Sequence, residues 1–180
     1  MRIQGKDEQC FTRLQAGEKA TLSDAQTTLV VQAESEMLAA AVDHGIIKGM
    51  GVGERKCDYL TFGTDKANTH LIELKGKVID AAFDQLMRTV ENLGKSAYPE
   101  TVRNRDRLDA YIVSPGSQSI PQGINKKERK LASLLARNSR LRVQNELELI
   151  QYVKVVPKQK SLVKKNRKII CSGTAPLRLE

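Results

Sequence analysis

The sequence predicts an α/β protein of the α+β type, in which a mixed central sheet is flanked by helices and extended by extra strands near the C-terminus. Two short apolar runs, 55–62 and 69–75, are separated by a polar turn, as in paired strands. An amphipathic helical pattern over 77–93 and a further apolar run at 108–113 follow. This strand, helix, strand order predicts a right-handed crossover, so the run at 108–113 should lie parallel to 69–75.

The chain length is consistent with a single domain over 1–180, because 180 residues can bury one sizeable core. We expect the core of this domain at about 23–114 and a basic C-terminal extension at about 115–180. No apolar run approaches the ~18 residues that a membrane span requires. The N-terminal residues lack the apolar segment of a signal peptide, so we expect a cytoplasmic protein with no membrane partner.

Positive charge is concentrated in the last third of the chain. Residues 126–180 carry 15 Lys and Arg against 4 Asp and Glu, a net charge of +11, whereas residues 1–125 carry 15 against 17, a net charge of −2. Such a region favours a nucleic-acid partner, since Lys and Arg neutralise phosphates and release counterions. The alternative is a solvated basic surface. The expected nucleic-acid contacts are Lys158, Lys160, Lys164, Lys165, Arg167 and Lys168.

A helix is expected over 23–44, after one or two edge strands. Ser23 and Gln26 have the spacing of a capping box, and the second half of the segment is rich in alanine. The β-branched residues within 27–31 oppose a helix, but the cap and the alanines outweigh them. Glu34 would fall on the apolar stripe of this helix. There it is either a third carboxylate of a metal site or a stripe-edge residue whose head reaches water.

Charged residues stand on the two expected strands at 55–62 and 69–75. Glu73 and Lys75 are two residues apart, so both side chains leave the same face of a strand. A carboxylate on an apolar strand is costly unless it is paired or binds a metal. Asp58 lies fifteen residues earlier, and a hairpin would bring its carboxylate beside Glu73. Two carboxylates and a lysine at one place suit a divalent cation bound to a phosphodiester.

The helix at 77–93 places Gln85 at its inward edge. Gln85 could hydrogen-bond a metal-bound water or a phosphate, or it could cap a backbone group of the core, and the pattern leaves both roles open. Further on, Asn125 opens a second helix, and strands are expected at 141–143 and 148–156.

The order of these elements and acids resembles the PD-(D/E)xK nuclease superfamily, which includes restriction endonucleases, Holliday-junction resolvases and RecB-type nucleases. The resemblance covers roughly residues 23–114 and implies a restriction-endonuclease-like α-β-β-β-α-β core. Asp58 matches the first metal-binding acid of the family, Glu73 the second and Lys75 the lysine.

Two further residues match the family and two depart from it. Glu34 matches the helical acid of some members, and Gln85 matches the glutamine of the following helix. Cys57 stands where many members have proline. Thr89 stands where RecB-type members have tyrosine, which weakens the RecB-type assignment.

The resemblance implies a metal-dependent endonuclease. Asp58, Glu73 and the Leu74 carbonyl, with Glu34 as a further ligand, would hold Mg²⁺, with Mn²⁺ as the alternative, through hard oxygen atoms. Lys75 would position the attacking water or neutralise the charge that develops on the phosphate. Asp58, Glu73, Lys75 and Gln85 are thus the expected catalytic residues.

The expected substrate is duplex or branched DNA, because aromatic residues make up only 4% of the chain and offer little stacking for single strands. A homodimer would suit the cleavage of two strands. The alternative is a catalytically inactive module of the same fold that binds nucleic acid or a protein partner, with Glu73 and Lys75 forming an ion pair.

Overall fold

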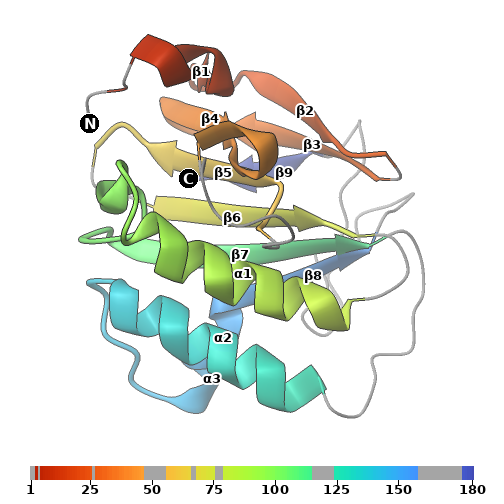
Figure 1. Ribbon diagram of the computed structural model, residues 1–180. Coiled ribbons are helices and arrows are strands. Elements are labelled where there is room, and N and C mark those ends of the chain that lie inside the picture. The colour runs from red at the N-terminus through yellow and green to blue at the C-terminus, as the bar shows by residue number, and fades with distance from the viewer. Residues whose placement is uncertain are drawn as a thin grey trace.

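A computed structural model describes residues 3, 5–25, 27–46, 56–65, 68–75, 79–114, 124–157 and 176–180. These residues form three layers, in which helices cover one face of a six-stranded sheet and a three-stranded sheet covers the other (Figure 1). The described part contains no helix with the length and apolar character needed to cross a membrane.

The larger sheet is mixed, as expected. The strands β4, β5 and β6 form an antiparallel meander, and β7 and β8 continue the sheet in parallel with β6. In spatial order the strands are β1 (Phe11–Leu14), β4 (Met37–Ala41), β5 (Tyr59–Gly63), β6 (Asn68–Leu74), β7 (Arg107–Ser114) and β8 (Val153–Pro157).

Two long helices cover one face of this sheet. The helix α1 (Asp80–Leu93) connects β6 to the parallel strand β7, so the predicted helix at 77–93 and the parallel strand after it are confirmed. The helix α2 (Ile124–Asn138) packs beside α1 and confirms the helix expected from Asn125.

The smaller sheet covers the opposite face and consists of β2 (Lys19–Ser23), β3 (Thr28–Ala33) and β9 (Leu177–Leu179). It corrects the sequence prediction, because the helix expected over 23–44 is not formed. The segment instead makes β3, β4 and a short π-helix, η2 (Val42–Ile46). The first helix of an α-β-β-β-α-β core is therefore not found in this segment.

The physical reason lies in two local signals. The side chains of β3 alternate between buried and more exposed positions, which is the period of a half-buried strand rather than of a helix. The supposed cap is a turn between β2 and β3, in which Asp24 Oδ1 accepts a hydrogen bond from the backbone N–H of Thr27.

The C-terminal strands are confirmed in part. No strand forms at 141–143. Of the strand expected at 148–156, only the second half forms, as β8. Before it, a short helix, α3 (Glu146–Leu149), starts after the N-cap residue Asn145, and a 3-10 turn, η4 (Ile150–Tyr152), follows. The side chain of Asn145 accepts a hydrogen bond from the N–H of Glu148.

The two faces of β6 belong to two different cores. Leu71 packs beneath the helices with Phe83 and Leu86 of α1. Ile72 and Leu74 pack against the smaller sheet. Because side chains alternate along a strand, residue 73 points toward the helical layer, as Leu71 does.

Candidate active site

Asp58, Glu73 and Lys75 meet at one end of the larger sheet. Glu73 lies on β6 beneath the helical layer and is fully buried. Lys75 follows β6 directly, and its Nζ lies 2.6 Å from Glu73 Oε1. Asp58 immediately precedes β5. Since Tyr59 pairs with Ile72, the next pair along this antiparallel ladder places Asp58 opposite Glu73.

Glu73 is poorly satisfied in this setting. Neither of its carboxylate oxygens makes a well-aligned hydrogen bond with a described residue, although Lys75 Nζ lies close to Oε1. Burial is the largest cause that raises the pKa of Glu73 from 4.5 to about 8, and the charge of Asp58 adds to it. Lys75 and the backbone N–H of Asp58 oppose this shift in the pKa of Glu73. A buried carboxylate with unfilled hydrogen-bonding capacity is an arrangement that a bound cation would satisfy.

Asp58 is held by the backbone of β6. Its Oδ2 accepts a hydrogen bond of 2.6 Å from the N–H of Leu74. Because the N–H and C=O of one residue in an extended strand point to the same neighbour, the Leu74 carbonyl also faces the side of Asp58. Burial is the largest cause that raises the pKa of Asp58, whereas the Leu74 N–H and the Lys75 ammonium lower it.

The helix α1 fixes the chain that leads into Asp58. Gln85 Nε2 donates a hydrogen bond of 2.9 Å to the carbonyl oxygen of Lys56. Thr89 Oγ1 accepts a hydrogen bond of 2.8 Å from the N–H of Cys57. Of the two roles open to Gln85, the structure therefore shows the backbone cap, which makes it a positioning residue for Asp58.

The oxygen atoms at this site fit a hard divalent cation. Among the described residues, no group of three or more His, Cys, Asp or Glu side chains is placed to hold a metal. The donors here are the carboxylates of Asp58 and Glu73 and the Leu74 carbonyl. Mg²⁺ binds through one or two carboxylates and completes its shell with water and substrate phosphate, so this donor set suits it.

Glu34 is not brought to this site. It lies in the turn between β3 and β4, with Oε1 3.6 Å from Arg178 NH1, and it lines a separate cavity. Its expected place depended on the helix at 23–44, which is replaced by strands. The other predicted contacts, the six basic residues within 158–168, lie outside the described residues.

A second charged cluster, which the sequence analysis missed, occupies the opposite face of the sheet. Asp109 is buried on β7 and contacts Arg107 and Lys154. His70 of β6 lies beside it, with Nδ1 4.0 Å from Asp109 Oδ2. The available signal was Asp109 itself, since it interrupts the apolar run at 108–113 much as Glu73 interrupts its own strand.

The chain matches no protein-family model, no curated protein and no solved structure. The chemistry of the two clusters is therefore the basis on which a function is assigned.

Proposed function

We propose that this protein is a metal-dependent nuclease that hydrolyses phosphodiester bonds of DNA, with Asp58, Glu73 and Lys75 as its catalytic centre. The observation that carries the proposal is the state of Glu73, a fully buried acid that lies beside a second acid, Asp58, and whose ion-pair partner among the described residues is Lys75. A buried, ionised carboxylate beside Asp58 destabilises the folded protein. A cation bound between the two acids would remove that cost.

The arrangement of strands supports a PD-(D/E)xK-like core. The antiparallel meander β4, β5 and β6, then α1 and the parallel strand β7, follows the β-β-β-α-β part of that topology. The leading helix has no counterpart at 23–44, where β3 and β4 stand instead. The proposal therefore rests on the five elements that carry and surround the acids.

Each residue of the centre has a distinct chemical role in this proposal. A bound Mg²⁺ would polarise the scissile phosphate and lower the pKa of a coordinated water. Glu73 must release its proton to act as a ligand, and the adjacent Lys75 ammonium favours that ionised form. Lys75 would also neutralise negative charge on the phosphate. Its ammonium is held at Glu73, and its side chain is only 23% exposed, so water would screen its charge little.

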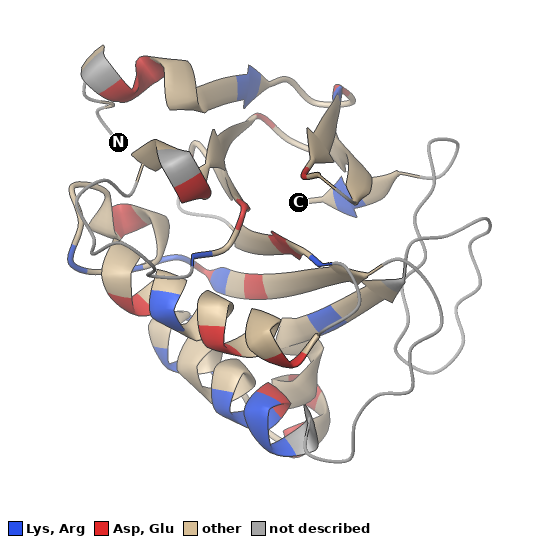
Figure 2. Cartoon of the chain, turned by 45° about the vertical axis from the view of Figure 1, so that its right-hand side comes forward, with Lys and Arg blue, Asp and Glu red and all other residues tan. Residues whose placement is uncertain are grey.

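The DNA backbone would contact basic surface beside this centre. Lys and Arg residues are frequent along α2 (Figure 2). Lys127 is neutralised by Asp80 and Asp84 of α1, whereas Lys126 and Lys130 are exposed. The strand β8 runs parallel to β6 and β7, so its C-terminal end lies at the same end of the sheet as Lys75. In the sequence, the basic segment 158–168 follows β8 directly.

Cleavage and metal binding are best tested separately. We would incubate supercoiled plasmid with Mg²⁺ or Mn²⁺ and compare the wild type with Asp58→Asn, Glu73→Gln and Lys75→Met. The same proteins would be titrated with Mg²⁺ while thermal unfolding is followed, because a ligand that binds only the folded state raises the melting temperature. Glu36→Gln is the matched control, since Glu36 is an acid in an exposed ion pair with Arg13.

We expect metal-dependent cutting by the wild type and by Glu36→Gln, and its loss in all three site variants. Metal-dependent stabilisation should vanish in Asp58→Asn and Glu73→Gln. If the wild type shows neither cutting nor stabilisation by metal, the nuclease proposal is wrong. Salt-sensitive DNA binding in that case would indicate the catalytically inactive binding module instead.

A further inference from the structure

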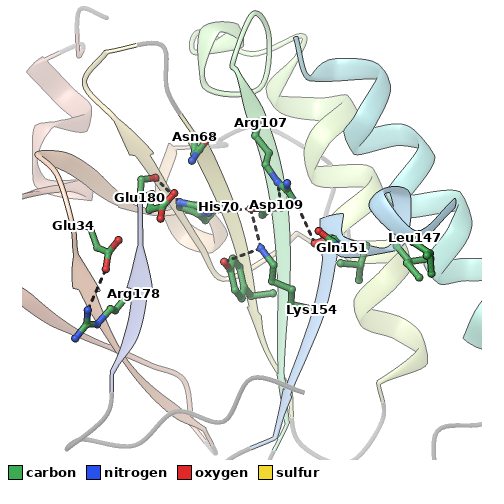
Figure 3. Close-up of a pocket in the computed structure, with 13 residues that line it drawn as sticks. Glu34, Asn68, His70, Arg107, Asp109, Leu147, Gln151, Lys154, Arg178 and Glu180 are labelled. Atoms are coloured by element: carbon green, nitrogen blue, oxygen red, sulfur yellow. Dashed lines mark hydrogen bonds and ion pairs between the residues drawn. The ribbon is translucent and has the colours of Figure 1, made fainter. Parts of the chain in front are cut away.

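A cavity of about 900 Å³ lies over the face of the larger sheet that α1 and α2 do not cover (Figure 3). We call it the β9 cavity, because β9 forms one of its walls and α3 with η4 forms another. Its floor consists of His70, Asp109, Tyr111 and Lys154, which come from the neighbouring strands β6, β7 and β8. It is separate from the Asp58–Glu73 centre, which occupies the opposite face.

Two cations, Arg107 and Lys154, contact the Asp109 carboxylate, so this group of three side chains carries one more positive charge than negative charge. Asp109 Oδ1 accepts a hydrogen bond of 2.9 Å from Arg107 Nε, and Asp109 Oδ2 lies 3.0 Å from Lys154 Nζ. Two cations thus share one buried carboxylate. His70 adds no charge at neutral pH, because burial lowers its pKa to about 4. Its Nε2–H donates instead to the Glu180 carbonyl, 3.0 Å away, and joins the β9 wall to the floor.

Arg107 and Lys154 together have more N–H donors than the acceptors around them can receive. Both oxygens of Asp109 are engaged. Lys154 uses one further hydrogen on the Tyr111 hydroxyl, at 3.1 Å, and Arg107 reaches the Gln151 carbonyl at 3.3 Å. One ammonium hydrogen of Lys154 and the NH1 group of Arg107 have no hydrogen-bond partner among the described residues. A ligand that supplies a single anionic group would meet both the charge and the donors.

The rim of the β9 cavity is partly apolar, whereas its floor is charged and polar. Leu147 of α3 is 66% exposed there, and it is one of two large apolar side chains that are exposed in the described part of the chain. Ile150 of η4 continues the same wall. Across the opening, Glu34 and Arg178 balance each other. Burial lowers the pKa of Lys154, and the negative charges of Asp109 and Glu180 oppose that effect.

We propose that the β9 cavity binds a small organic acid that has one carboxylate head and an apolar body. The carboxylate would sit on Arg107 and Lys154, and the body would cover Leu147 and Ile150. Arginine suits a planar carboxylate, and the volume is within the range of sites that hold small organic ligands. This inference is independent of the nuclease proposal, because it uses none of the same side chains.

Binding would be measured by isothermal titration calorimetry with four probes. Octanoate carries both the head and the body, acetate carries the head alone, 1-octanol carries the body alone, and inorganic phosphate is a different anion. We expect octanoate to bind at least tenfold more tightly than each of the other three probes. Equal affinity for acetate or phosphate would mean that the apolar rim takes no part, and it would overturn the proposal, as would no binding of octanoate.

Two substitutions locate the binding. Lys154→Gln should weaken octanoate binding about tenfold or more, because it removes a charge-assisted hydrogen bond. Leu147→Ser should weaken it about threefold to tenfold without affecting folding, since the side chain is exposed. Leu141→Ser is the matched control, because Leu141 is the other exposed large apolar residue, at 55%, and does not line the cavity. If Leu147→Ser and Leu141→Ser bind octanoate equally well, the site lies elsewhere and the proposal fails.

Discussion

The hydroxyl group of Thr89 joins α1 to Cys57, the residue before Asp58. Thr89 Oγ1 accepts from the Cys57 N–H at 2.8 Å and donates to the Gln85 carbonyl at 2.8 Å. Both partners are buried, and the hydroxyl satisfies a backbone donor that has left the strand ladder. A single side chain on the helix therefore helps to set the position of a carboxylate on the sheet.

Replacing Thr89 by valine should destabilise the protein. The variant keeps the size and branching of the side chain but leaves the buried Cys57 N–H without its acceptor, which costs roughly 1–3 kcal/mol. Thr89→Ser keeps the hydroxyl and should cost clearly less. Urea denaturation of the three proteins measures the difference. Equal stability of the valine and serine variants would show that this hydrogen bond contributes little.

The stability of the metal-free protein should fall with rising pH because of Glu73. Its folded pKa of about 8 lies above its ordinary value of 4.5, so between these two values the folded state holds a proton that the unfolded state has released. Stability from the protonated form is complete below about pH 4.5 and is lost as the pH rises through about 8. The slope over this window is at most roughly 1.4 kcal/mol per pH unit.

Glu73→Gln keeps the shape of the protonated acid and cannot ionise. We expect its stability to exceed that of the wild type increasingly as the pH rises from about 5 to 8, when unfolding is measured in a chelating buffer. Parallel pH profiles for the two proteins would contradict the raised pKa. Addition of Mg²⁺ should reduce the difference, because the metal would stabilise the ionised wild-type carboxylate.

Lys75→Met should separate binding from catalysis in the proposed nuclease. The substitution removes the ammonium that lies 2.6 Å from Glu73 Oε1 but leaves Asp58 and Glu73 in place. We expect metal-dependent DNA cleavage to fall about a hundredfold or more, since a charge directed at the reacting phosphate is lost. Stabilisation by metal should persist. Unchanged single-turnover cleavage rates would exclude Lys75 from the reaction.

Arg105 should be a major structural residue of the β5–β6 connection. Its side chain is only 5% exposed, and it donates to the carbonyl oxygens of Gly63, Asp65 and Asn68 at 2.8–3.2 Å. Arg105→Met leaves three acceptors without their donor and should cost roughly 2–4 kcal/mol in the free energy of unfolding. Arg103→Met, at an exposed position nearby, is the control and should be close to neutral. Similar losses in both variants would contradict this role.

The local sequence pattern was sufficient to predict α1, β7 and the place where Asp58, Glu73 and Lys75 meet. The apolar stripe of α1 and the apolar run of β7 depend on neighbouring residues, so their periodicity could be read directly. The meeting of Asp58, Glu73 and Lys75 follows from the same kind of short-range geometry. A hairpin between adjacent strands brings the first two together, and the alternation of one strand places the third beside Glu73.

The segment at 23–44 shows where local pattern fails. It holds a helix-like cap and alanines together with β-branched residues, so its own preference is divided. The choice is made by pairing: β3 lies between β2 and β9, and its register places Val31 beside Leu177. A partner almost 150 residues away decides the structure of this segment, and no window of sequence contains that contact.

The sequence by itself determined the β6–α1–β7 unit and the acids and lysine that meet beside it, because these features arise from periodicity and from the pairing of adjacent strands. Only the tertiary structure decided that Glu34 belongs with Arg178, that Gln85 caps the Lys56 carbonyl, and that Asp109 is shared by Arg107 and Lys154. These side chains come from segments that are distant in the chain. Their contacts exist only after the two sheets and the helices have packed and buried their polar groups together.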